Sequence, residues 1–322
     1  EALTEEQKAQ GTNYETLVAA EAALKALQSA NLPKISGNLS LNETIDINYI
    51  IPAVVDMTDA VLVVKNAATG EDVPYTVLPG LNGTTVVRYS ARANHMTDEI
   101  TVQVFDANGN PLTQKASMSI RKYAGMLFNS ANDTLKMMLI RMLDYGALAQ
   151  INSGVTTDLA NSIVTPELRA FADSYAWAEA VEVELPASSG GLFKASLALN
   201  ETIDVTVYTA ATNVAEGDKF VVKCNGVELS EDAYIVRLLD DGRYAIRYSV
   251  KSNKMNDEIY IAIVGEDGTV KAATTLGVRI YAQKFLQAVP TGDQAAMILA
   301  MLDYGALAQV YADTDADDLA NR

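Results

Sequence analysis

The stretch MLDYGALAQ occupies Met142–Gln150 and occurs again, unchanged, at Met301–Gln309. Such an identity within one chain indicates an internal duplication, and a duplication has to be found before the rest of a fold is interpreted. Apolar residues lead into the stretch at helical spacing and predict a helix over about 134–151, with its equivalent over 294–311. The stripe comprises Leu135, Met138, Leu139, Met142, Gly146 and Ala149, widened by Leu143, Ala147 and Leu148. A helix this apolar is expected to be buried on most sides.

Each copy of the stretch contains a glycine, Gly146 or Gly305, in the interior of the predicted helix. Glycine costs a helix about 1 kcal/mol relative to alanine at such a position. We therefore expect another backbone to approach each helix closely at its glycine.

The similarity extends outward from the two stretches. Leu199–Asp204 reproduces Leu41–Asp46, residues 246–269 run without a gap against 87–110, and Leu319-Ala320-Asn321 matches Leu159-Ala160-Asn161. The Leu-Thr-Glu-Glu start also resembles Val164–Glu167. We predict two tandem homologous units, residues 1–160 and 161–322, each consisting of a helix, a β-domain and a second helix. The order suggests a fragment of a longer modular protein.

Between the helices the hydrophobic period changes to two. Ile45, Ile47 and Tyr49 alternate with polar residues, and further runs fall at 61–64, 73–78, 84–89, 100–104 and 117–123. Thr69-Gly70, Asn82-Gly83 and Asn108-Gly109 are turn signals between them. About seven short strands at this spacing are typical of an immunoglobulin-like antiparallel β-sandwich. The predicted fold is therefore mainly β, with helices packed on each sandwich.

Two further helices and a linker are predicted. Residues 1–30 have apolar residues at helical spacing, and Pro33 ends that pattern. Residues 166–180 predict a second short helix, with Pro166 in its first turn and Leu168, Phe171 and Tyr175 on its apolar stripe. Residues 188–191, Ser-Ser-Gly-Gly, predict a flexible link into the second unit.

Composition excludes several classes of partner. The net charge of −17 argues against nucleic acid and anionic membrane surfaces, because both need a basic face. Cys224 is the only cysteine, so an intrachain disulfide and cysteine-based metal sites are excluded. No run approaches the ~18 apolar residues of a membrane span. We expect no cofactor, no metal and no membrane insertion.

Catalytic motifs are equally weak. His95 is the only histidine, and the second copy has Lys254 at that position, so the shared unit does not need an imidazole. Asp and Glu total 41, which makes any pair at the spacing of a glycosidase uninformative. Asp313, Asp315, Asp317 and Asp318 resemble the start of a calcium loop but lack its glycine, which favours a solvated tail. We predict that the protein is not an enzyme.

Aromatic residues without a counterpart in the other copy are the best candidates for a binding site. Trp177 is the only tryptophan, and on a continued helix it would face away from Tyr175. Tyr208 and Tyr260 replace Ile50 and Thr101 of the first copy at outward positions of their strands. Exposed rings stack on the apolar face of sugars, so these four residues are the predicted carbohydrate-binding residues. The alternative is that Trp177 packs against the neighbouring unit.

The repeated stretch, followed by a polar loop and Asp-Leu-Ala-Asn and preceded by Arg-x-Tyr-Ala, resembles a repeat in large secreted proteins of clostridial gut bacteria. The paired units are similar to the second domain of starch-adherence proteins of cell-surface amylosomes. That resemblance implies a non-catalytic extracellular module that binds starch-like α-1,4-glucans, including maltooligosaccharides, in a groove between two lobes. It also implies other modules of a larger surface protein or complex as partners. The alternative is a cell-surface adhesion or spacer module without sugar binding.

Overall fold

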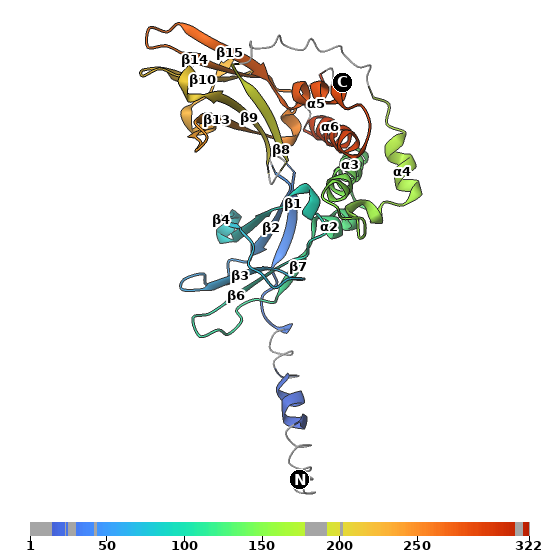
Figure 1. The fold of residues 1–322 in the computed structure, drawn as a ribbon. Coiled ribbons are helices and arrows are strands. Elements are labelled where there is room, and N and C mark those ends of the chain that lie inside the picture. Colours follow the sequence, from blue (N-terminus) through green and yellow to red (C-terminus); the bar gives the residue numbers. More distant parts are fainter. Residues whose placement is uncertain are drawn as a thin grey trace, which may run out of the picture. The chain divides into compact units, whose positions relative to one another are not determined.

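A computed structural model describes residues 15–22, 24, 30–41, 44–177, 192–199, 202–312 and 318–321 (Figure 1). Within these residues the chain forms fifteen strands in four antiparallel sheets, together with the helices α2–α6. Residues 15–22 are also helical, within the helix predicted over 1–30. The chain divides into two compact units. The first contains the described residues up to Asn38 with Ile47–Tyr89 and Asp98–Met118, and the second contains the remainder.

The first unit is built on two sheets. One has the order β1 (Ser36–Ser40), β2 (Asp46–Ile51), β5 (Thr85–Ser90) and β4 (Thr76–Pro79), and the other has β3 (Val61–Asn66), β6 (Ile100–Phe105) and β7 (Ala116–Met118). The Tyr49 hydroxyl in β2 donates a hydrogen bond of 2.6 Å to the Ile100 carbonyl in β6. That buried bond ties the two sheets together through the core.

The predicted alternation in β2 holds for its apolar residues, since Ile47 and Tyr49 are almost completely buried. The polar residues that alternate with them, Asp46 and Asn48, are buried as well, because each has a hydrogen-bonding partner. Asp46 accepts from the Thr44 hydroxyl at 2.5 Å, and Asn48 accepts from Arg88 Nε at 3.0 Å.

Two further sheets belong to the second unit. One has the order β12 (Ile235–Leu238), β13 (Arg243–Val250), β9 (Ile203–Ala210) and β8 (Lys194–Leu199). The other has β11 (Val227–Glu228), β10 (Lys219–Cys224), β14 (Ile259–Val264) and β15 (Val270–Leu276). Phe220 in β10 contacts Tyr244 in β13 edge to face, with ring centroids 5.3 Å apart, so that a ring pair joins these two sheets.

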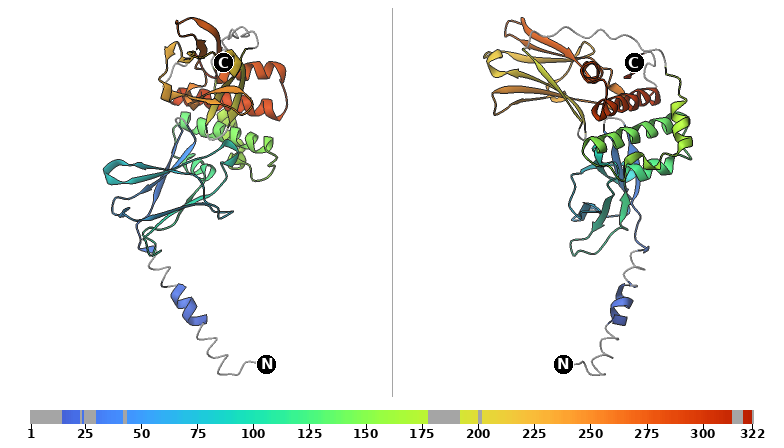
Figure 2. Two further views of the ribbon diagram at one scale, coloured as in Figure 1. Left: turned by 60° about the vertical axis from the view of Figure 1, so that its left-hand side comes forward. Right: turned by 45° about the vertical axis from the view of Figure 1, so that its right-hand side comes forward.

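The repeated stretch lies in the two long helices α3 (Asp133–Asn152) and α6 (Asp293–Tyr311), which pack against each other in the second unit (Figure 2). Tyr145 and Tyr304 stack at this interface, with ring centroids 6.5 Å apart and planes 13° apart. Both rings are buried. Burial raises the pKa of the Tyr304 hydroxyl to about 12, so that it stays neutral at ordinary pH. The prediction of two largely buried helices is confirmed.

The glycines of the repeat admit a close neighbour, but it is chiefly a methionine side chain. A Cβ on Gly146 would lie 2.5 Å from Met96 Sδ and 3.1 Å from the Ala93 carbonyl oxygen. A Cβ on Gly305 would lie 2.5 Å from Met255 Sδ. The expected backbone approach is thus found at Gly146, whereas a thioether fills the space at Gly305.

One predicted strand is partly wrong. Residues 117–123 contain only the end of β7, and the chain then turns into α2 (Ile120–Leu127). Ser119 caps that helix by accepting a hydrogen bond from the Lys122 backbone N–H, and Ile120 and Ala124 bury one face. The residues of the second copy that match this part of α2, Arg279 and Tyr281, likewise lie in a helix, α5 (Val278–Ala288).

The helix predicted over 166–180 is shorter than expected. α4 covers Pro166–Asp173, capped at its start by Thr165. At its end Ser174 donates its hydroxyl to the Phe171 carbonyl, and its N–H bonds to the Ala170 carbonyl. Residues 178–180 and the predicted linker 188–191 lie outside the described residues. No helix among the described residues is long and apolar enough to cross a membrane.

Candidate functional site

The candidate site begins at the C-terminal end of α4, where the chain leaves the helix. Tyr175 and Trp177 both follow the capping residue Ser174, and both are half-buried. Their rings meet edge to face, with centroids 4.8 Å apart and planes 79° apart. The prediction that Trp177 faces away from Tyr175 on a helix is therefore wrong, because the helix ends before both residues. The structure instead brings these two predicted site residues together.

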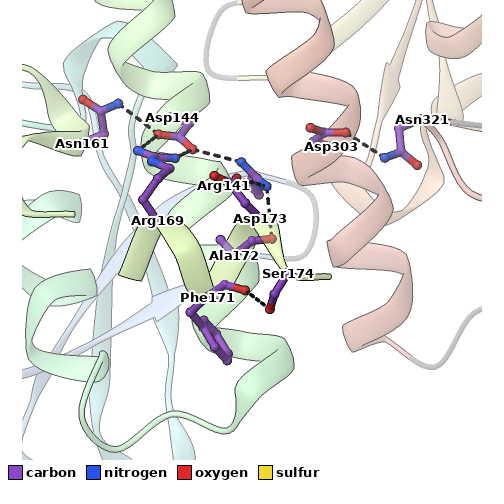
Figure 3. A network of polar contacts seen from close by, with 10 residues as sticks. All are labelled: Arg141, Asp144, Asn161, Arg169, Phe171, Ala172, Asp173, Ser174, Asp303 and Asn321. Atoms are coloured by element: carbon purple, nitrogen blue, oxygen red, sulfur yellow. Dashed lines mark hydrogen bonds and ion pairs between the residues drawn. The ribbon is translucent and has the colours of Figure 1, made fainter. Parts of the chain in front are cut away.

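A polar network connects α4, which ends just before these two residues in the chain, to α3 (Figure 3). Asp144 of α3 forms a bidentate ion pair with Arg169 of α4, in which Nη2 lies 2.6 Å from Oδ1 and Nη1 binds Oδ2. Asn161 donates a third hydrogen bond to Asp144 at 2.9 Å. The hydrogen bond to Asp144 is the main cause that raises the pKa of the Arg169 guanidinium, so Arg169 stays positively charged.

Arg141 links the network to the chain that carries the aromatic pair. Its Nη2 donates to the Asp173 carboxylate at 2.8 Å and to the Ala172 carbonyl at 3.1 Å, while Nη1 lies 3.7 Å from Asp144. The Asp173 side chain is 55% exposed, so a carboxylate that Arg141 holds in place faces solvent two residues from Tyr175. Aromatic rings beside fixed polar groups are the usual components of a sugar-binding surface.

Arg141 and Asp173 are the site residues that sequence reasoning missed. The second copy has Ala300 at the position of Arg141, so Arg141 breaks the repeat in the same way as the unmatched aromatics do. A search for charged residues, as well as aromatic ones, that lack a counterpart in the other copy identifies Arg141 from the sequence.

The other two predicted site residues lie elsewhere. Tyr208 is in β9 and Tyr260 is in β14, which belong to different sheets. Arg243 lies over the Tyr208 ring, 4.9 Å from its centroid, and the Tyr208 hydroxyl is 3.2 Å from the Ser196 hydroxyl. Lys223 lies over the Tyr260 ring at 5.9 Å. A cation therefore covers one face of each ring.

Other candidate groups have structural neighbours. Among the described residues, no group of three or more His, Cys, Asp and Glu side chains could hold a metal ion. His95 is half-buried in the short 3₁₀ turn η2 (Ala93–His95), which packs against α3. Burial, with Asp257 nearby, raises the pKa of the Cys224 thiol to about 11, which leaves it a poor nucleophile at neutral pH.

Asp318 is a structural residue rather than part of a solvated acidic tail. Its carboxylate binds the guanidinium of Arg279, and it accepts a hydrogen bond of 3.0 Å from Asn256. Asp158 binds Arg121 in the same way at the matching position of the first copy. Residues 313–317 lie outside the described residues.

Comparison with known proteins adds no assignment. No family model matches the chain, and no curated protein matches it.

Proposed function

We propose that this protein is a non-catalytic carbohydrate-binding module for starch-like α-1,4-glucans, carried by a secreted or cell-surface protein. The observation that supports the proposal is the contact between the Tyr175 and Trp177 rings, two and four residues after Asp173, whose carboxylate Arg141 binds. Two rings at nearly a right angle form a corner in which the C–H face of a pyranose stacks on one ring. The exposed carboxylate of Asp173 accepts hydrogen bonds from sugar hydroxyls, and Arg141 fixes its position.

The ligand class rests on the resemblance to starch-adherence proteins. That resemblance includes the repeat, and we propose that residues 1–160 and 161–322 are homologous units, each an immunoglobulin-like sandwich with packed helices. Matched polar contacts support this part of the proposal. Gln150 accepts a hydrogen bond from the Ala160 backbone N–H, and Gln309 accepts one from the Ala320 N–H, both at 2.7 Å.

Tyr208 and Tyr260 take a secondary place in the proposal. A cation already occupies one face of each ring, so a sugar stacks there only on the opposite face. Neither residue lies on the same element as Tyr175 or Trp177. We expect these two tyrosines to contribute less to glucan affinity than the aromatic pair.

Retardation of the protein in a native gel that contains amylopectin tests the proposal. The expected result is slower migration in amylopectin and unchanged migration in a gel that contains a β-linked glucan. Incubation with maltooligosaccharides should release no reducing sugar, with or without added divalent metal. Unretarded migration in amylopectin would refute sugar binding and favour the adhesion or spacer alternative, and reducing sugar that grows with time would refute the absence of catalysis.

A further inference from the structure

One face of the sheet formed by β12, β13, β9 and β8 points away from the core of the second unit (Figure 1). Tyr244 of β13 packs on Phe220 of the opposite sheet, so the residues that alternate with Tyr244 point outward. Residues that pair directly across two strands share a face. The strand residues of this outward face are Lys194, Ser196 and Ala198 of β8, Asp204, Thr206, Tyr208 and Ala210 of β9, Arg243, Ala245, Arg247 and Ser249 of β13, and Ile235 and Arg237 of β12.

The outward face is basic, although the net charge of the chain is −17. Four of its described strand residues are cations, and one, Asp204, is an anion. Asp204 is 2% exposed and lies 3.7 Å from the guanidinium of Arg247. Asp241, in the turn between β12 and β13, pairs with Arg243 at 2.5 Å. These two carboxylates leave the other cations of the face without a charge partner.

Arg237 is one of these cations, and it lies close to Arg243. Its side chain is exposed, and no ion pair joins it to another described residue. Arg237 pairs with Ala245 across the strands, two residues from Arg243. Such diagonal neighbours have Cα atoms about 7–8 Å apart, so the two long side chains can reach one anionic group. A guanidinium binds a phosphate or a carboxylate through two parallel N–H groups.

Tyr208 places an aromatic ring next to these two arginines. The guanidinium of Arg243 lies over its ring at 4.9 Å, and the hydroxyls of Tyr208 and Ser196 are 3.2 Å apart. Lys194, which pairs with Tyr208 across the strands, is also exposed and forms no ion pair with a described residue. The ring is therefore held in position, with a cation on each neighbouring strand.

This combination of a ring and cations is specific to the second copy. At the positions that match Lys194, Tyr208, Arg237 and Arg243, the first copy has Ser36, Ile50, Leu78 and Thr84. Arg247 and Asp204, in contrast, match Arg88 and Asp46. The fold common to both copies therefore needs the shared charges but not the three additional cations or the ring.

The size and charge of the face restrict its ligand. A nucleic acid carries a charge on every nucleotide, and its affinity depends on many cations, whereas this face has four and the whole chain is acidic. A largely neutral polymer with few anionic groups avoids that repulsion. Amylopectin is such a polymer, because a small fraction of its glucose units carries phosphate monoesters.

We propose, on the basis of the proposed function, that the outward face binds phosphate monoesters of the α-glucan. Arg237 and Arg243 bind the phosphate, and Tyr208 contacts the sugar that carries it. Lys194, on the other side of the ring, binds the same group or a neighbouring hydroxyl. The face is thus a second site, which selects phosphorylated regions of the polymer.

Affinity electrophoresis with two preparations of one amylopectin tests this proposal: the phosphate-bearing polymer, and the same polymer after a phosphatase has removed its phosphate. The expected result is stronger retardation by the phosphate-bearing polymer, with the excess lost at high salt because exposed charges are screened. Equal retardation by both preparations would overturn the proposal and leave the proposed function intact. Retardation by the phosphate-bearing polymer alone would support the proposal and refute glucan binding at the aromatic pair. Retardation by neither would refute both.

Charge reversal tests the position of the site. Arg237→Glu should weaken retardation by the phosphate-bearing polymer about three- to tenfold, and Lys194→Glu by less, while retardation by the dephosphorylated polymer stays unchanged. Lys219→Glu, at an exposed position of β10 in the other sheet, changes the net charge equally and should leave both unchanged. Trp177→Ala should weaken both alike. An equal loss with Arg237→Glu and Lys219→Glu would show an effect of net charge alone and overturn the site.

Competition separates a phosphorylated sugar from other anions. Glucose 6-phosphate should abolish the excess retardation at a lower concentration than inorganic phosphate does at the same ionic strength, because Tyr208 contacts the sugar. Equal competition by the two would overturn that contact. Polygalacturonate, which carries a carboxylate on every sugar, should retard the wild type and Arg237→Glu equally. Retardation by polygalacturonate that depends on Arg237 would show that the face recognises negative charge alone, which would overturn the assignment to glucan phosphate.

Discussion

At the scale of single residues, Trp177 is the side chain on which the proposed site depends most. It shares an edge-to-face contact with Tyr175, and both follow the end of α4. An aromatic residue that anchors a ligand typically contributes a few kcal/mol to binding. Trp177→Ala should therefore weaken α-glucan binding at least about tenfold, measured by isothermal titration with a maltooligosaccharide.

The control for this prediction is Tyr75→Ala, because Tyr75 is an exposed aromatic residue that the site does not use. It should leave the affinity unchanged. A Trp177→Ala variant that keeps its affinity but loses thermal stability would mean that Trp177 has a packing role only.

A second residue-scale prediction concerns the carboxylate of Asp318. Burial alone would raise its pKa, but hydrogen bonds from Arg279 and Asn256 outweigh burial and hold the pKa below its usual value. A group with a lowered folded-state pKa stabilises the fold above its unfolded pKa, about 3.9, and loses that contribution as the pH falls through the folded value. Asp318→Asn should therefore lower the free energy of unfolding by about 1 kcal/mol at neutral pH, since the carboxylate is half exposed.

Denaturant unfolding at several pH values measures this effect. The difference between wild type and Asp318→Asn should shrink below pH ~4, where the wild-type carboxylate also becomes protonated. Asp241→Asn is the matched control, because Asp241 pairs with Arg243 on an exposed turn. A difference that is constant down to pH ~2 would contradict the ion-pair explanation.

At the scale of elements, the sequence predicts those segments whose periodicity is long or whose turns are strongly marked. The long helices extend over Asp133–Asn152 and Asp293–Tyr311, close to the predicted 134–151 and 294–311. Asn82 and Gly83 have φ of 53° and 77°, the left-handed conformation that Asn-Gly favours between two strands.

The secondary structure of short segments is harder to predict from sequence, because a run of a few apolar residues fits both the helical and the strand period. Residues 120–123 became the start of α2 because Ser119 supplies an N-cap and Ile120 and Ala124 pack as a helical pair. α4 ends at Asp173 because the Ser174 hydroxyl and N–H turn back onto carbonyls of its last turn. That early end decides the geometry of the candidate site, and the apolar spacing does not encode it.

The two glycines of the repeat give an element-scale prediction. Alanine at Gly146 or Gly305 gains about 1 kcal/mol of helix propensity but forces its Cβ onto a methionine sulfur. A Cβ on Gly146 would also lie 3.1 Å from the Ala93 carbonyl oxygen, and backbone moves aside less easily than a thioether side chain. Gly146→Ala should therefore destabilise the protein by about 1–3 kcal/mol in urea unfolding, and Gly305→Ala by less.

The matched test of this explanation replaces the methionine. Gly305→Ala should lower the free energy of unfolding less in a chain that already carries Met255→Ala than it does in the wild-type chain. Equal destabilisation by both glycine substitutions would show that the methionine contact, rather than the carbonyl, sets the cost in both copies.

At the scale of the whole molecule, the repeated stretch forms one interface instead of two separate ones. α3 and α6 contact each other, and the stacked Tyr145 and Tyr304 come from the same position of the two copies. Residues that match between copies, such as Gln150 and Gln309, hold the loops that follow the helices. Unmatched residues, such as Arg141 and Trp177, lie beside α4. We infer that shared positions maintain the fold and that binding is concentrated where the copies differ.

Intrinsic fluorescence during titration with a maltooligosaccharide reports directly on whether a sugar stacks on Trp177, because this is the only tryptophan in the chain. Stacking of a sugar at the Tyr175–Trp177 pair predicts a saturable change in tryptophan emission, with a midpoint equal to the calorimetric Kd. A β-linked oligosaccharide of the same length should leave the emission unchanged. Calorimetric binding of the α-glucan without any change in Trp177 emission would exclude stacking on Trp177 and place the glucan elsewhere.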